Sequence, residues 1–188
     1  MEREAENIRT KISYYIVCFF ILCLIGWGLE VAESFIRLGI FVNRGFLYGP
    51  FVPIYAFGAL AIYFFLNKLM KKRISLWKIN ITPMILFMAM LLITAVLEYA
   101  TSWILEMIFG RTWWNYSYEM FNLHGRIFLR NILLFGLLGI IYLYTVEPLM
   151  RKGLSKIKEM HLRYIAIICL IILSVDIYFS VTGHLHLW

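Results

Sequence analysis

Residues 81–105 read ITPMILFMAMLLITAVLEYATSWIL, and this stretch decides the fold class. Its only charged residue is Glu98. As a helix, which rises about 1.5 Å per residue, the stretch is long enough to cross a hydrocarbon core of about 30 Å. Its apolar residues are continuous rather than alternating, and an open strand could not satisfy its backbone hydrogen bonds in lipid. The stretch therefore predicts a membrane-spanning helix.

Four further apolar stretches have the same character and lie at residues 14–36, 51–70, 127–149 and 163–183. Of the 188 residues, 62% are hydrophobic and 15% are charged, whereas soluble domains contain about 25% charged residues. This composition excludes an ordinary soluble enzyme, a disordered regulator and a nucleic-acid-binding module as first interpretations. We predict an all-α polytopic membrane helix bundle in the plasma membrane, a single transmembrane domain over residues 1–188 with five spans in contact with lipid.

Lys and Arg are concentrated in alternate connections between these spans. The N-terminal arm and the second and fourth connections contain Arg3, Arg9, Lys11, Lys68, Lys71, Lys72, Arg73, Lys78, Arg151, Lys152, Lys156, Lys158 and Arg163. The first and third connections contain only Arg37, Arg44, Arg111, Arg126 and Arg130. Because Lys and Arg are enriched in cytoplasmic loops, this alternation predicts that the N-terminus is inside and the C-terminus outside.

The two connections on the predicted outer side have an unusual composition. Residues 43–55 read NRGFLYGPFVPIY, in which Gly and Pro favour a tightly folded turn. Residues 113–126 read WWNYSYEMFNLHGR and are rich in aromatic side chains. An interfacial aromatic belt would explain the rings. It would not explain Arg44, Asn122 and Arg126, which are polar groups that anchoring does not need.

Ionisable residues also lie inside the predicted spans. Glu30, Glu98 and Asp176 lie about 24, 22 and 18 Å from the inner ends of the first, third and fifth spans, calculated from the helical rise. Arg130 lies a few residues below the outer end of the fourth span. Across a core of about 30 Å, four spans thus place charged groups in the outer half of the bilayer.

The spacing of the polar residues places them on shared helix faces. Thr94, Glu98, Ser102 and Glu106 are four residues apart, as are Asp176 and Ser180. A charge that faces lipid at mid-depth costs at least about 2.5–3.5 kcal/mol, so we expect acids and arginines at one depth to pair inside the bundle. We predict a buried polar site that opens outward, formed by spans one, three, four and five under the two outer loops. The residues predicted to bind its ligand are Glu30, Arg44, Tyr48, Glu98, Trp114, Asn122, Arg126, Arg130 and Asp176.

We expect neither a cofactor nor a metal site in this chain. The sequence lacks the Gly-x-x-x-x-Gly-Lys-Ser/Thr phosphate loop, so any ATPase would be a separate subunit. Cys18, Cys23 and Cys169 lie within apolar stretches, which is typical of small core hydrophobes. Pro148, directly after Glu147, predicts the end of the fourth helix.

Several motifs together resemble one known family. They are Gly26-Trp27 with Glu30, the loop of residues 43–55, Leu97-Glu98-Tyr99, Leu105-Glu106, Phe109-Gly110, Trp113-Trp114-Asn115-Tyr116 and Phe121-Asn122-Leu123-His124-Gly125-Arg126. Over residues 12–150 the chain resembles the putative ABC-transporter type IV (CmpB-like) family of small bacterial multi-pass membrane proteins. The resemblance implies a permease-like component and no particular substrate.

Three functions are compatible with the sequence. The resemblance favours a transport protein whose acids bind a small solute or ion and whose arginines act as counter-charges or anion ligands. An intramembrane enzyme that acts on a lipid headgroup or a lipid-linked phosphate at the outer leaflet is an alternative, since paired arginines bind phosphate. An accessory subunit is the third, because structural salt bridges would also produce this pattern. Five spans are few for a complete carrier, so we expect a separate ATPase subunit or a homo-oligomer as partner, and no nucleic acid.

Overall fold

The computed structural model describes residues 2–43 and 45–185 of the chain. Among these residues, five helical segments are long and apolar enough to cross a membrane, which confirms the all-α fold with five candidate spans. The segments are Glu6–Leu38, Pro53–Met70, Thr82–Phe109, Leu129–Leu154 and Glu159–Leu185. The first span begins well before the predicted residue 14, because the charged N-terminal arm continues the same helix.

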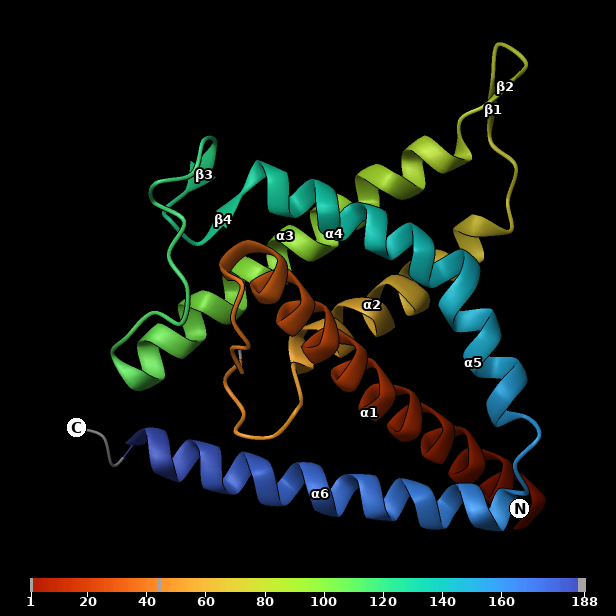
Figure 1. Ribbon diagram of the computed structural model, residues 1–188. Coiled ribbons are helices and arrows are strands. Elements are labelled where there is room, and N and C mark those ends of the chain that lie inside the picture. The colour runs from red at the N-terminus through yellow and green to blue at the C-terminus, as the bar shows by residue number, and fades with distance from the viewer. Residues whose placement is uncertain (1, 44, 186–188) are drawn as a thin grey trace. The chain divides into compact units, whose positions relative to one another are not determined.

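The elements follow one another in a simple order (Figure 1). They are α1 (Glu2–Leu38), α2 (Pro53–Met70), β1 (Ser75–Leu76), β2 (Ile79–Asn80), α3 (Thr82–Phe109), β3 (Asn122–Leu123), β4 (Ile127–Phe128), α4 (Leu129–Ile141), the π-helical turn η1 (Tyr142–Val146), α5 (Glu147–Leu154) and α6 (Glu159–Leu185). The chain divides into two compact units. The first comprises Met1–Ala56 and Leu149–Trp188, and the second comprises Phe57–Pro148.

Proline and glycine set several helix ends. Pro53 begins α2 and Pro83 lies in the first turn of α3, where the missing N–H has no partner to lose. Gly39 follows α1 with φ +70°, and its N–H donates to the carbonyl of Phe35 at 2.9 Å. Gly110 ends α3 in the same left-handed conformation. Glycine adopts this conformation without the steric cost that a side chain brings, so both helices stop where the sequence supplies it.

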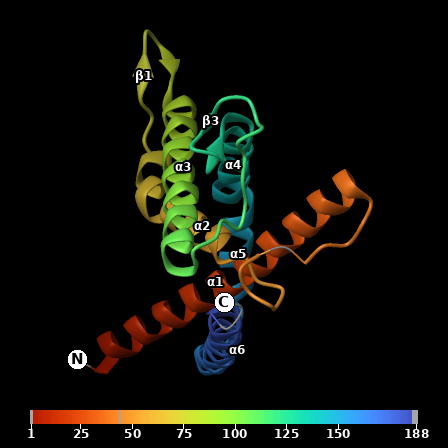
Figure 2. The ribbon, with the colours of Figure 1, turned by 90° about the vertical axis from the view of Figure 1, so that its left-hand side faces the viewer.

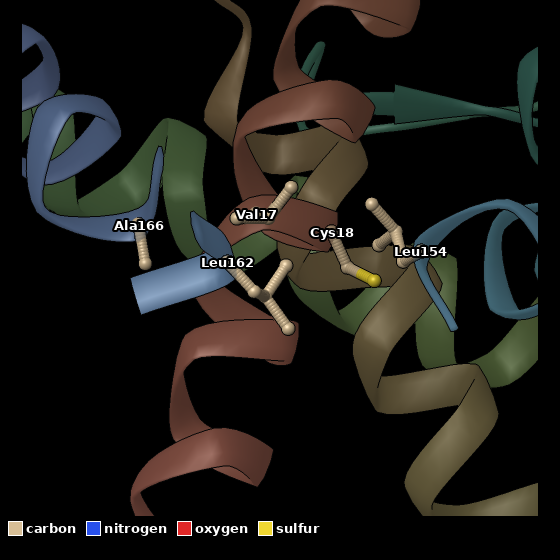
Figure 3. Close-up of a cluster of buried hydrophobic side chains, with 5 residues drawn as sticks. All are labelled: Val17, Cys18, Leu154, Leu162 and Ala166. Carbon is tan, nitrogen blue, oxygen red and sulfur yellow. The ribbon is translucent and has the colours of Figure 1, made fainter. Parts of the chain in front are cut away.

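In the first unit, α1, α5 and α6 meet around a small apolar cluster (Figure 3). The buried members are Val17, Cys18, Leu154, Leu162 and Ala166. In lipid, close packing between helices replaces the exclusion of water as the main stabilising term, and the small side chains of Cys18 and Ala166 allow the helices to approach each other closely. At the edge of the cluster, Arg163 of α6 forms an ion pair of 3.2 Å with Glu6 of α1.

In the second unit, α3 and α4 lie side by side as an antiparallel hairpin, as both ribbon views show (Figures 1 and 2). Two glycines of α4 allow the close approach. A Cβ atom at Gly136 would meet the side chain of Leu91, and one at Gly139 would lie 3.1 Å from the sulfur of Met90. Both glycines are buried, so small residues at the contact bring the two backbones together, as is common in membrane helix pairs.

The prediction that Pro148 ends the fourth helix is wrong. The helix continues to Leu154 through the π-helical turn Tyr142–Val146, in which the N–H of Glu147 donates to the carbonyl of Tyr142. A proline inside an α-helix removes one hydrogen bond and its ring collides with the carbonyl four residues earlier. The wider π turn directly before Pro148 relieves that collision. The hydrogen-bond pattern of the helix therefore shifts by one residue at this turn, and the helix continues.

The orientation of the helices in the membrane stays a prediction, which cysteine labelling can test. We expect that neither Ser75→Cys nor Ser155→Cys, each in an otherwise Cys-free background, reacts with an impermeant thiol reagent added outside intact cells. Both serines are exposed, so both cysteines should react after the cells are permeabilised. Tyr118→Cys, at a position that is 98% exposed on the predicted outer side, is the control that should react without permeabilisation. Labelling of position 75 or 155 in intact cells would contradict the topology.

Candidate polar sites in the two units

A polar stripe runs along α3 and faces α4. Four-residue spacing brings Thr94, Glu98, Ser102 and Glu106 to one side of the helix. Glu98 and Ser102 are each 4% exposed. The hydroxyl of Thr94 donates to the carbonyl of Met90 in its own helix at 2.9 Å. The stripe therefore places two carboxylates on the helix pair, one of them almost completely buried.

Arg126, just before α4, reaches the outer part of this stripe. Its Nη1 donates to Oγ of Ser102 at 3.2 Å, and its Nη2 donates to a carboxylate oxygen of Glu106. Its guanidinium also lies 5.7 Å from the ring centroid of Tyr99. The arginine side chain is 16% exposed and that of Glu106 is 40% exposed. The pair is therefore partly desolvated, and its attraction is screened less than that of a surface pair.

Glu98 has a partner that was not among the predicted ligand residues. Nδ2 of Asn131, in the first turn of α4, donates to Oε1 of Glu98 at 2.6 Å. Arg130, the neighbouring residue that was predicted to bind ligand, is exposed. The signal for Asn131 was its position, since Arg130 and Asn131 are the two polar side chains at the start of the predicted fourth span.

Two predicted ligand residues build the loop that holds Arg126. Nε1 of Trp114 donates to the carbonyl of Arg126 at 2.9 Å. Asn122 donates to the carbonyl of Glu119 at 2.9 Å and accepts from the N–H of Gly125 at 3.0 Å. These bonds fold residues 113–126 back onto α3, so Trp114 and Asn122 fix the position from which the guanidinium of Arg126 projects.

His124 also takes part in this group, although the sequence analysis did not include it among the ligand residues. Its Nδ1 lies 2.8 Å from the hydroxyl of Tyr99. Its φ of 54° is left-handed, as is that of Gly125 at 67°, so the chain turns sharply here. A Cβ atom at Gly125 would lie 2.8 Å from Oδ1 of Asn115, so glycine is required for both the turn and the space.

The first unit contains a second polar group, where the loop after α1 is attached to α6. The N–H of Tyr48 donates to Oγ of Ser180 at 2.9 Å. The N–H of Gly49 donates to the carboxylate of Asp176 at 3.1 Å, and Ser180 donates to the same carboxylate at 3.2 Å. Nε2 of His184 lies 2.9 Å from the carbonyl of Phe46. Asp176, Ser180 and His184 thus form one stripe with four-residue spacing along α6 that binds the loop backbone.

Glu30 belongs to a third contact, also within the first unit. The hydroxyl of Tyr55 donates to Oε1 of Glu30 at 2.8 Å. One turn earlier on α1, Gly26 is buried against the ring of the same tyrosine. Gly26 and Glu30 therefore hold the two ends of one side chain, and they fix the start of α2 beside α1.

The nine residues predicted to bind a ligand fall into both units. Glu30, Tyr48 and Asp176 belong to the first unit. The members in the second unit are Glu98, Trp114, Asn122, Arg126 and Arg130. Arg44 lies outside the described residues. The pocket predicted to be shared by spans one, three, four and five stays a prediction.

The attachment of the loop to α6 gives a prediction about Ser180, whose side chain is fully buried. Ser180→Ala removes the acceptor for the N–H of Tyr48, and we expect a loss of about 0.5–1.5 kcal/mol with faster proteolysis of residues 39–52. Ser174→Ala, at an exposed position on the same helix, is the matched control and should leave both properties unchanged. Thermal unfolding and limited proteolysis of the purified proteins would measure the difference. Equal behaviour of the two variants would show that the hydrogen bond does not order the loop.

A family model described as Putative ABC-transporter type IV matches residues 17–181. The matched segment contains Glu30, Asp176 and the whole polar group of the second unit, and it ends just before His184. Comparisons with curated proteins and with solved structures each give no match.

Proposed function

Because the chain belongs to the putative ABC-transporter type IV family, we propose that it is a permease-type component of a transporter in the bacterial plasma membrane. Five apolar helices make it a multi-pass membrane protein. The group of Glu98, Ser102, Glu106, Arg126 and Asn131 between α3 and α4 is proposed to bind a small polar solute or ion. The site would open to the outer side, and a separate subunit would supply any ATP hydrolysis.

The observation that carries this proposal is the burial of Glu98 within a membrane-spanning helix. A carboxylate 4% exposed at this depth is expensive to insert, and such residues mark solute and ion pathways in membrane proteins. Its hydrogen bond to Asn131 crosses between two helices, so the group is part of the helix contact and does not face lipid.

The chemistry of the group suits a small ligand that carries charge. Arg126 has five N–H donors in a planar fork, so it can bind a ligand oxygen while it keeps its bonds to Ser102 and Glu106. The carboxylate of Glu98 can accept from an ammonium group or contact a cation. A solute with both an acidic and a basic group would therefore satisfy the two ends of the site together.

A ligand screen with thermal unfolding tests this function. We expect that at least one member of a panel of inorganic anions, metal cations and amino acids raises the Tm of the purified wild-type protein. A ligand at 100 times its Kd stabilises by about 2.7 kcal/mol, which such a screen detects. In Arg126→Gln the shift should disappear, because the guanidinium that binds the ligand is gone.

The control for this variant is Arg37→Gln. Arg37 also forms an ion pair with a carboxylate, that of Glu33 at 2.9 Å, but its side chain is 54% exposed and lies on α1. This variant should show the same ligand-induced Tm shift as the wild type. Loss of the shift in both variants, or in neither, would refute a binding site at Arg126.

A further inference from the structure

The hairpin between α2 and α3 combines exposed apolar and basic side chains. Leu76 and Ile79 are cross-strand partners and so point to the same face of the hairpin. They are 56% and 68% exposed, and Trp77 at the tip is 86% exposed. The basic residues around them are all exposed and are Lys71, Lys72, Arg73 and Lys78.

The base of this hairpin is well ordered by Thr82, the first residue of α3, which is 3% exposed. Its hydroxyl donates to the carbonyl of Lys72 at 3.0 Å and accepts from the N–H of Ile74 at 2.8 Å. The N–H of Ile81 donates to the carbonyl of Ile74 at 2.9 Å and closes the hairpin. The exposed side chains are therefore presented by a fixed backbone and not by a loose connection.

The tip contains residues that the turn itself does not favour. Trp77 and Lys78 have φ of 52° and 69°, which makes this a two-residue turn of the type that prefers Asn, Asp and Gly. Neither a tryptophan nor a lysine improves such a turn. The turn itself therefore does not explain why these two residues stand at the tip.

The neighbouring helices keep this hairpin at the bilayer. The 18 residues of α2 extend about 27 Å, slightly less than a hydrocarbon core of about 30 Å, so the end of α2 lies at the membrane boundary. The hydrogen bond between Ile74 and Ile81 leaves four residues in each arm of the hairpin, which reach about 13 Å at about 3.3 Å per residue. The whole hairpin therefore stays close to the headgroup layer.

We propose that the β1–β2 hairpin binds anionic phospholipid headgroups, with Trp77, Leu76 and Ile79 in the interface and the basic residues on the phosphates. Charge complementarity supports this partner, because residues 67–97 contain no Asp or Glu. Tryptophan is the side chain most typical of the membrane interface, and basic clusters next to a span attract anionic lipid. The hairpin is thus a lipid anchor, and it does not depend on the solute site between α3 and α4.

Fluorescence quenching in lipid nanodiscs tests the proposal. Leu76→Cys, in an otherwise Cys-free chain, is labelled with an environment-sensitive dye and reconstituted in phosphatidylcholine with or without phosphatidylglycerol. With the anionic lipid we expect quenching by headgroup nitroxides and protection from acrylamide in water. We expect the ratio of lipid-bound to water-exposed label to fall at least tenfold in the triple variant with Lys71→Gln, Lys72→Gln and Lys78→Gln. Each basic residue contributes about fivefold to the equilibrium constant for membrane binding.

The matched control removes three exposed lysines from another segment, with Lys152→Gln, Lys156→Gln and Lys158→Gln. It should leave the quenching at position 76 unchanged. If acrylamide reaches the label equally in both lipids, or if both triple variants behave alike, the anchor is refuted. Protection that occurs in native membranes but not in nanodiscs would also overturn it, because that result would mean that a protein partner covers the hairpin.

Discussion

Gly26→Ala should lose about 1–3 kcal/mol of stability, the usual cost of overpacking a well-packed contact. A Cβ atom at this position would lie 2.6 Å from both Cβ and Cγ of Tyr55. The position of the Tyr55 Cβ atom is set by the backbone, so no change of side-chain rotamer can move it away. To make room, the start of α2 would have to move from α1, and the bond between Tyr55 and Glu30 would break.

Gly28 provides the matched control for this prediction. It lies in the same helix, and a Cβ atom there would meet nothing within 4 Å. Since alanine is a better helix former than glycine, Gly28→Ala should equal the wild type or gain up to about 1 kcal/mol. Thermal unfolding of the two variants should therefore differ by about 1–4 kcal/mol in stability. Equal Tm values would mean that α1 and the start of α2 are not in contact through Gly26.

Glu98→Ala should destabilise the protein by about 2–4 kcal/mol, whereas Glu98→Gln should keep the fold. The alanine variant leaves the amide of Asn131 without the acceptor that it has at 2.6 Å, and it also creates a cavity beside a buried residue. Glutamine retains an oxygen at nearly the same place and so retains this hydrogen bond. It removes the negative charge, and with it the ligand-induced Tm shift of the proposed function.

The two Glu98 variants are measured together by folded yield, Tm and ligand response. Glu33→Ala is the control, because its carboxylate is 38% exposed and pairs with exposed Arg37, so its loss should be about 0–1 kcal/mol. A stable, ligand-responsive Glu98→Ala protein would show that the buried carboxylate has neither a structural nor a binding role. A Glu98→Gln protein that responds normally to ligand would limit the role of Glu98 to the contact between α3 and α4.

The five spans could be predicted from the sequence because a continuous apolar stretch of sufficient length has no other stable state in lipid. The polar face of α3 could also be predicted, since four-residue spacing places Glu98 and Ser102 on one side of a helix. In the structure both residues face α4. The hydrogen-bond partners of these side chains could not be predicted. Whether Glu98 meets Arg130 or Asn131 depends on the rotation of α4, and that rotation is set by the packing of its glycines against α3.

Two other differences have local causes. Pro148 does not end its helix, because a π turn before it makes room for the ring, and such a turn leaves no mark in the periodicity of apolar residues. His184 binds the loop carbonyl of Phe46, although it was not among the residues predicted for the polar site. Its position four residues after Ser180 extends the stripe of α6, and this spacing was the signal that could have identified it.

The division of the chain into units has a consequence for its synthesis. The second unit is one uninterrupted segment, whereas the first is assembled from the two ends of the chain. At a translation rate of about 5–20 residues per second, about 7–30 s pass between the completion of α1 and the completion of α6. During that interval α1 lacks α6, the helix against which it packs, while α2, α3 and α4 can already associate. The first unit is therefore completed only when α6 packs against α1. In a nascent chain released before α6 is made, Val17 and Cys18 of α1 would lack their contacts with Leu162 and Ala166.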